Sequence, residues 1–67
     1  MISYDRLFKL LKEKNISQYR LIKSGISNST LERLKKDQYV NLITIDKLCA
    51  LLDCDIEDIV EYKKSED

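Results

Sequence analysis

The chain has 67 residues, 43% of them hydrophobic and 36% charged, with one glycine and no proline, which excludes collagen-like, linker-like and disordered chains and leaves room for one small domain. Its 12 basic and 12 acidic residues cancel, but residues 1–36 hold nine basic and three acidic residues (+6), and residues 37–67 hold three and nine (−6). The N-terminal half can therefore present a basic face to a polyanion although the whole chain is neutral.

The sequence shows no apolar stretch long enough to span a membrane and no secretory signal at its N-terminus, so we expect a cytoplasmic protein with no membrane partner. Cys49 and Cys54 are too few for a disulfide scaffold, and without histidine only carboxylates could complete a zinc site. We interpret both cysteines as buried reduced thiols and expect no metal and no cofactor. The lack of histidine also removes the commonest general base, so we do not expect an enzyme.

Apolar residues recur at helical spacing in five segments, each preceded by a residue that favours a helix N-cap. The expected caps are Ser3, Ser17, Ser27, Thr44 and Asp55. They introduce predicted helices over residues 4–14, about seven residues from Gln18, 28–36, 45–52 and 56–62. The predicted fold class is all-α, a compact five-helix bundle that forms one domain over residues 1–62.

Two segments are predicted to lie outside the helices. Residues 37–43 have no helical period but contain several apolar side chains, which favours an ordered loop pinned to the core. Residues 63–67 are polar, and we expect them to form a C-terminal tail.

The second and third predicted helices are joined by a few residues that include the only glycine, Gly25. Two short helices with such a connection form a helix-turn-helix unit, here residues 17–36. Gly25 suits the sharp turn because glycine adopts a positive φ without a steric penalty. Ile26 directly after it is expected to fill the angle between the two helices.

The third predicted helix separates its polar and apolar side chains. At about 100° per residue, Thr30, Leu31 and Leu34 fall on one side. The opposite side carries Asn28, Ser29, Glu32, Arg33 and Lys36. Arginine forks to guanine, asparagine pairs with adenine and glutamate accepts from cytosine, so the first four are candidate base-reading residues, and Lys36 suits a phosphate. Any amphipathic helix has a polar face, so this face alone does not indicate DNA binding. The turn at Gly25, the cap at Ser27 and the basic half of the chain favour DNA as the ligand.

Several stretches together carry a family pattern: Ser17–Gln18, Gly25–Ser27, Ser29–Leu34, Ile45–Cys49 and Leu52–Ile59. On these residues nearly the whole chain resembles the Cro and phage-repressor type of helix-turn-helix regulators, the XRE family, in particular its small stand-alone bacterial members. The resemblance implies a lambda-repressor-like domain whose third helix enters the major groove of double-stranded DNA. It also implies that Gln18 grips a phosphate and that Tyr39 and Asn41 lie along the DNA backbone.

The full set of expected phosphate contacts is Gln18, Ser27, Lys35, Lys36, Tyr39 and Asn41. Two positions depart from the family pattern. A small alanine is usual four residues before the turn glycine, and here that place is Leu21 or Ile22, which leaves the register of the second helix open. Asp37 and Gln38 replace the usual Asn-Gly after the third helix. The expected function is sequence-specific regulation of transcription, and we expect a repressor.

One recognition helix reads few base pairs, so specific binding normally takes two copies about 34 Å apart, one turn of DNA. We therefore expect a homodimer, at least on DNA, and no small-molecule ligand. The candidate dimer interface is the part of the fifth helix that a small core cannot bury. Its residues are Ile56, Ile59, Val60 and Tyr62. A monomer in which this helix only closes the bundle is the alternative.

Two other functions stay open at this point. A protein-interaction module, such as an antitoxin-like or adaptor protein, could use the acidic half from Asp37 to Asp67 to bind a basic partner. A small hydrolase would need acidic pairs, for which the sequence offers Asp53 with Asp55 and Glu57 with Asp58. Those residues fit helix capping and a solvated face better.

Overall fold

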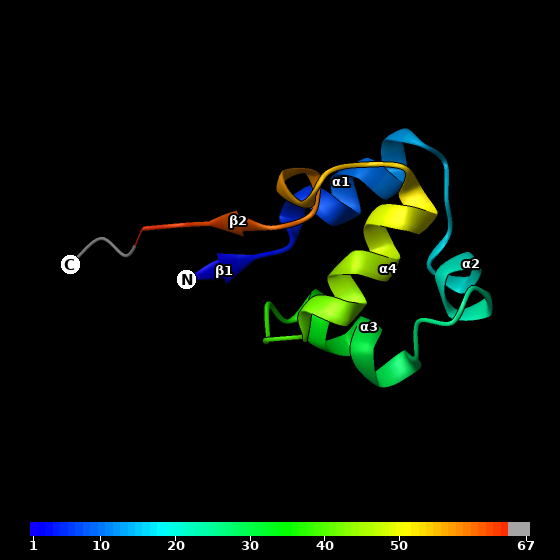
Figure 1. The fold of residues 1–67 in the computed structure, drawn as a ribbon, viewed down its shortest axis with the longest axis horizontal. Helices are drawn as coiled ribbons and strands as arrows, with labels where there is room; N and C mark the ends of the chain where they lie inside the picture. Colours follow the sequence, from blue (N-terminus) through cyan, green and yellow to red (C-terminus); the bar gives the residue numbers. More distant parts are fainter. Residues whose placement is uncertain (65–67) are drawn as a thin grey trace.

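The computed structural model describes residues 1–64 (Figure 1). Its elements are, in chain order, β1 (Ile2–Ser3), α1 (Asp5–Glu13), α2 (Gln18–Lys23), α3 (Asn28–Lys35), α4 (Leu42–Leu52), the 3₁₀ helix η1 (Ile56–Asp58) and β2 (Glu61–Tyr62). The α-helices cluster together, and a ribbon of β1 and β2 projects from them at the end remote from α2 (Figure 1). The mostly helical class is as predicted, with four α-helices in the described residues where five were expected.

The prediction of a fifth helix over residues 56–62 is wrong. This segment forms one turn of 3₁₀ helix and then a strand that pairs with the N-terminus. The pairing is antiparallel, with Ile2 opposite Tyr62 and Ser3 opposite Glu61. A seven-residue helix is marginal without tertiary packing, whereas the N-terminal residues supply backbone hydrogen-bond partners for the end of the chain.

The hydrophobic core lies between the helices and takes side chains from each of them. Its buried members are Tyr4, Leu7, Leu11, Leu21, Ile26, Leu31, Leu34, Ile45, Leu48, Leu52 and Ile59. Burial of each such Leu or Ile contributes about 1.5–3 kcal/mol, which makes the leucine-rich core the main source of stability for so short a chain.

All four α-helices end in the same way, with a residue of positive φ just past the helix. These residues are Asn15, Gly25, Asp37 and Asp53. After α3, the N–H of Gln38 donates to the carbonyl of Arg33 at 2.8 Å, and the N–H of Asp37 donates to Leu34 at 3.3 Å. This is the Schellman pattern, which satisfies carbonyls that the helix leaves unpaired. Three of the four ends rely on Asn or Asp, which tolerate the left-handed region better than other side chains.

Of the five predicted N-caps, Ser17, Ser27 and Asp55 are confirmed, and Ser3 and Thr44 are not. The hydroxyl of Ser17 accepts a hydrogen bond from the N–H of Arg20, and that of Ser27 accepts one from Thr30, each at 3.2 Å. At α1 the cap position is Tyr4, although the Ser3 hydroxyl accepts a hydrogen bond from the N–H of Asp5.

At α4 the predicted cap, Thr44, is wrong. Asn41 caps this helix, because its Oδ1 accepts from the N–H and from the hydroxyl of Thr44 at 2.9 and 2.8 Å. The helix therefore begins at Leu42, three residues before the predicted start. The loop before it is pinned to the core by Val40, whereas Tyr39, Leu42 and Ile43 are exposed, so the expectation that the apolar residues of 37–43 hold the loop to the core is only partly correct.

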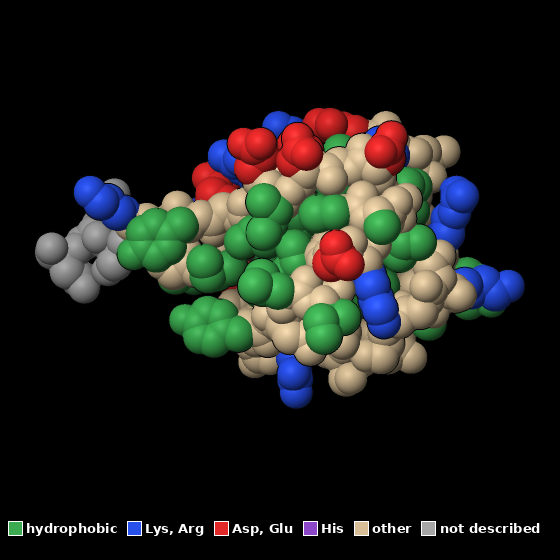
Figure 2. Space-filling model, in the orientation of Figure 1, with side chains coloured by type: hydrophobic (Ala, Val, Ile, Leu, Met, Phe, Trp, Pro, Cys, Tyr) green, Lys and Arg blue, Asp and Glu red, His purple; other side chains and the backbone are tan. Residues whose placement is uncertain are grey.

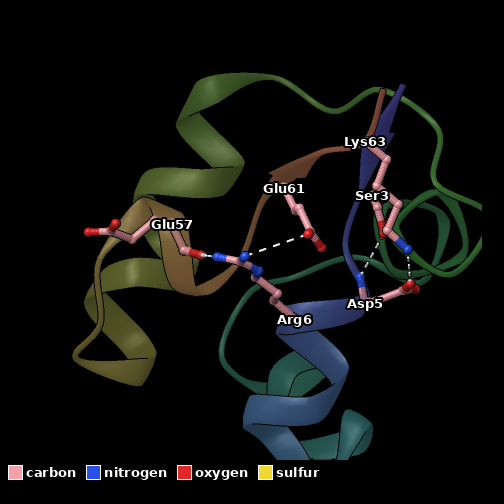
Figure 3. A network of polar contacts seen from close by, with 6 residues as sticks. All are labelled: Ser3, Asp5, Arg6, Glu57, Glu61 and Lys63. Carbon is pink, nitrogen blue, oxygen red and sulfur yellow. Dashed lines mark hydrogen bonds and ion pairs between the residues drawn. The ribbon is translucent and has the colours of Figure 1, made fainter. Parts of the chain in front are cut away.

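A network of polar contacts ties the β ribbon to the first turn of α1 (Figure 3). Lys63 Nζ lies 2.8 Å from the Asp5 carboxylate, and Arg6 contacts the Glu61 carboxylate at 3.5 Å and the Glu57 carbonyl at 3.0 Å. Lys63 therefore belongs to the folded unit, although we expected the tail to begin there. Residues 65–67 of that predicted tail lie outside the described residues. In residues 1–64 no helix is long and apolar enough to cross a membrane.

Candidate nucleic-acid interface

The helices α2 and α3 are held at a tight turn by backbone and core contacts. Gly25 has a φ of 110°, a value that L side chains rarely adopt. The N–H of Ile26 donates to the carbonyl of Leu21 at 3.1 Å, and both of these side chains are buried. The predicted helix-turn-helix is therefore present, with the glycine and the isoleucine in the roles expected of them. The helix α2 runs over Gln18–Lys23. Within it, the side chain of Leu21 is buried and that of Ile22 is half-buried.

The polar side of α3 is open to solvent. Leu31 and Leu34 are buried and Thr30 is half-buried, as the sequence predicts. The exposed residues are Asn28, Ser29, Glu32, Arg33, Lys35 and Lys36. The buried leucines fix how the helix sits on the bundle, so the exposed side chains project from a rigid support.

Some of these side chains already have partners within α3. Glu32 forms an ion pair with Lys35 at 3.5 Å. The Ser27 hydroxyl caps the helix, donates to the Thr30 hydroxyl at 2.9 Å and lies 3.2 Å from the hydroxyl of Ser29. Within the described residues Arg33 and Lys36 form no ion pair, so their charges are directed to solvent or to a ligand.

The other predicted phosphate contacts come from α2 and from the loop before α4. Gln18 is exposed at the first position of α2, and Tyr39 is 78% exposed. Asn41 uses its Oδ1 to cap α4, which leaves its amide N–H groups as donors. Sequence reasoning missed Leu42, which directly follows Asn41 and is 75% exposed at the start of α4. The signal in the sequence is Asn41, a residue type that favours the N-cap position. With Asn41 as the cap, Leu42 falls on the first turn of the helix.

The sequence prediction also missed an exposed aromatic residue on α2. Tyr19 lies on α2 beside Gln18, and the ammonium group of Lys23 is 5.4 Å from the centre of its ring. The two residues are four apart, which places them on the same helix face, and this spacing is visible in the sequence.

The helix-turn-helix and the edge opposite it differ in their balance of charge. Residues 17–36, which make up the helix-turn-helix, contain five basic residues and one acidic residue, a balance of +4. Acidic side chains gather along the edge formed by α1, η1 and the end of α4, and α3 lies along the opposite edge (Figures 1 and 2). Because α1 also carries Arg6, Lys9 and Lys12, the charges at the first edge are mixed. A polyanion is therefore attracted more strongly to the helix-turn-helix.

Three of the four acidic residues considered for hydrolysis, Asp53, Asp55 and Asp58, have structural roles. Asp55 is the N-cap of η1, and its N–H donates to the Asp58 carboxylate at 3.0 Å, so the two residues form a capping box. Asp53 is the left-handed residue that ends α4. Both cysteines are free thiols and are half-buried, and burial, with a smaller contribution from Cys49, raises the pKa of Cys54 to about 11. No group of three or more potential metal ligands occurs within residues 1–64.

The predicted dimer residues do not form one surface. Ile59 is fully buried in the core and is unavailable to a partner, which corrects the sequence prediction. Val60 is half-buried, whereas Ile56 and Tyr62 are exposed. The prediction failed because it placed these residues on one helix, whereas Ile56 lies on η1, Tyr62 lies on β2, and Ile59 and Val60 lie between these two elements.

The helix-turn-helix geometry agrees with a family comparison. A family model described as "Cro/C1-type HTH DNA-binding domain" matches residues 6–65. The chain belongs to this family. Among solved structures, this Cro/C1-type domain is similar to the transcriptional regulator VanUg, with 36% sequence identity and a TM-score of 0.84 over 90% of this chain and 81% of that chain. No curated protein matches the domain.

Proposed function

We propose that this Cro/C1-type domain regulates transcription by binding a specific sequence of double-stranded DNA with α3 in the major groove. In this proposal the domain acts in the cytoplasm and catalyses no reaction. We propose that it is a repressor, because a protein that occupies a promoter can block transcription without a separate surface for contacting the transcription machinery. The observation that carries the proposal is the exposed polar side of α3, supported by buried Leu31 and Leu34 within a segment of charge +4.

The exposed side chains divide into two roles. Asn28, Ser29, Glu32 and Arg33 read base edges, and Arg33 is the strongest candidate because its guanidinium forms no ion pair in the described residues. The phosphate contacts are made by Gln18, Ser27, Lys35, Lys36, Tyr39 and Asn41, which lie on α2, at the two ends of α3 and in the loop before α4. Phosphate contacts position the domain, and base contacts supply specificity.

Two copies bind one DNA site in this proposal. A single α3 of eight residues reaches few base pairs, so a second copy is needed for specific binding at physiological salt. Double-stranded DNA and a second copy of the chain are thus the two partners.

A binding-site selection from random duplexes tests the proposal. We expect a common motif with two related halves, and binding to it that weakens steeply as salt concentration rises. The matched control is the Arg33→Ala, Lys36→Ala double variant, which keeps the fold and loses binding to the selected site. Absence of a motif together with a flat salt response would contradict DNA binding and favour a protein-interaction module that uses the acidic edge.

A further inference from the structure

Three hydroxyl groups meet at the start of α3. The Ser27 Oγ accepts a hydrogen bond from the N–H of Thr30 at 3.2 Å and donates one to the Thr30 hydroxyl at 2.9 Å. It also lies 3.2 Å from the hydroxyl of Ser29. A serine hydroxyl has one proton and two acceptor lone pairs. Because Ser27 gives its only proton to Thr30, the hydrogen bond between Ser27 and Ser29 uses the proton of Ser29.

We propose that Ser27 fixes Ser29 as a hydrogen-bond acceptor, so that Ser29 reads a base with an exocyclic amino group, adenine or cytosine. A free serine hydroxyl donates or accepts and can therefore contact any base. With its proton committed to Ser27, Ser29 presents only lone pairs to the major groove. Adenine N6 and cytosine N4 donate to such a group, whereas guanine O6 and thymine O4 are themselves acceptors. This inference rests on the proposed function, in which α3 lies in the major groove.

Ser29 lies where α3 can reach the edge of a base. At about 100° per residue it stands roughly 160° around the helix axis from buried Leu31 and roughly 140° from buried Leu34. It is exposed, and it is the second residue of α3. The N-terminal residues of a recognition helix are those that contact base edges. The direction of the Ser29 hydrogen bond therefore bears directly on which base it accepts.

The hydroxyl of Ser27 is fully used within the protein. Its proton goes to Thr30, and its two lone pairs accept from the Thr30 N–H and from the Ser29 hydroxyl. These hydrogen bonds become stronger when DNA excludes water from around α3, because the local dielectric constant falls. A phosphate contact of Ser27 then uses its backbone N–H, which has no partner within residues 1–64. Ser27 is thus a positioning residue that acts on base preference through Ser29.

The side chains that adjoin Ser29 also divide into acceptors and donors. Glu32 and Arg33 lie three and four residues after Ser29, so they are its neighbours on the helix surface. The ionised carboxylate of Glu32 only accepts hydrogen bonds, and the guanidinium of Arg33 only donates them. Ser29 and Glu32 therefore present acceptors side by side to bases with amino groups, and Arg33 presents donors to guanine.

Substitutions at the two partners of this network test the inference without touching Ser29. Ser27→Gly removes the acceptor of the Ser29 proton and costs little helix stability, because glycine is tolerated at N-caps. Thr30→Val keeps the shape of threonine but removes the oxygen that accepts the Ser27 proton. Ser27 can then donate to Ser29, which releases the Ser29 proton for a base. Ser27→Asn is the matched control, because its side-chain oxygen caps the helix and still accepts from Ser29.

Competition between duplexes that carry each of the four bases at every position of the selected site measures the preference. For the wild type we expect one position, identified by its loss in Ser29→Ala, at which adenine or cytosine binds about fivefold or more tightly than guanine or thymine. Ser27→Gly and Thr30→Val should abolish this difference at that position and leave the preferences at other positions unchanged. Ser27→Asn should keep it. Thermal unfolding reports on the fold of each variant.

The outcomes separate this inference from the proposed function. A preference for guanine or thymine at the Ser29 position, or a preference for adenine and cytosine that survives in Ser27→Gly or in Thr30→Val, would overturn the inference and leave DNA binding intact. Equal loss of the preference in Ser27→Asn and Ser27→Gly would also overturn it, because the hydroxyl direction would then not set the preference. Absence of any motif for the wild type would instead overturn the proposed function, and this inference with it.

Discussion

The carboxylate of Asp37 accepts a hydrogen bond of 2.9 Å from the backbone N–H of Tyr4. Asp37 is the left-handed residue, with a φ of 55°, that ends α3, and Tyr4 is the buried residue that precedes α1. The end of the candidate DNA-reading helix is therefore attached to the start of the first helix. One side chain both tolerates the left-handed turn and makes a contact across 33 residues, which a glycine at this position could not make.

Replacement of Asp37 by alanine should destabilise the domain. Alanine leaves the Tyr4 N–H without its partner, at a cost of about 1–3 kcal/mol, and is strained by about 1 kcal/mol in the left-handed region. Asp37→Asn is the matched control, since asparagine keeps an acceptor oxygen and tolerates this φ. Urea denaturation measures both variants, and equal stability of Asp37→Ala and Asp37→Asn would show that the contact contributes nothing.

Replacement of Gly25 by alanine should lower the free energy of unfolding by about 1 kcal/mol or more. A Cβ at this position would meet no atom within 4 Å, so the loss reports backbone strain at φ 110° and not a steric clash with neighbours. Ser24→Ala, at an ordinary φ of −86°, is the control and should change stability much less. An unchanged denaturation midpoint for Gly25→Ala would refute the role of glycine in the turn.

Arg33 should determine specificity at one base position. Arg33→Ala is expected to weaken binding to the selected site by about 1–3 kcal/mol and to relax the preference at that position. Arg33→Lys keeps the charge but loses the two-pronged hydrogen bond, so it should also lose specificity while it retains the salt dependence. Competition between site variants measures the effect, and equal weakening on all sequences would assign Arg33 to the phosphates.

Lys36 should contact phosphate instead. Lys36→Ala is expected to weaken binding by a similar factor on all sequences and to reduce the slope of log affinity against log salt by about one unit. The control is Lys12→Ala on α1, which lies across the molecule from α3 and should leave the slope unchanged (Figure 1). A slope that does not differ between Lys36→Ala and the wild type would remove Lys36 from the interface.

The ion pair between Asp5 and Lys63 should make the β ribbon sensitive to pH. The hydrogen bond from Lys63 lowers the pKa of Asp5, and the same contact raises the pKa of Lys63. The contribution of Asp5 is thus present above its unfolded pKa and lost as pH falls through the lowered value, and that of Lys63 is lost as pH rises through its raised value. The stability difference between wild type and Asp5→Asn should therefore shrink below about pH 4 and above about pH 10. Denaturation of both proteins across this pH range measures the stability difference. A stability difference that does not depend on pH would contradict the ion pair between Asp5 and Lys63.

The sequence alone determined the features that depend on neighbours in the chain. The caps Ser17 and Ser27, the turn at Gly25 and the two faces of α3 are all interactions over three to five residues, and each is present in the structure. Because the helical period and the cap positions are local, they can be recognised without knowledge of the rest of the fold. The candidate reading surface was predictable for the same reason.

Only the tertiary structure decided what happens where distant segments compete for the same residues. Residues 56–62 have the spacing of a short helix, but pairing of Glu61 and Tyr62 with Ser3 and Ile2, about sixty residues away, makes their end a strand. In this arrangement Ile59 is buried, and the contact from Asp37 to Tyr4 likewise joins residues far apart in the sequence, 33 positions from each other. Such pairings depend on how the helices bring the two chain ends together, and the free energy of that packing is not encoded in any local pattern.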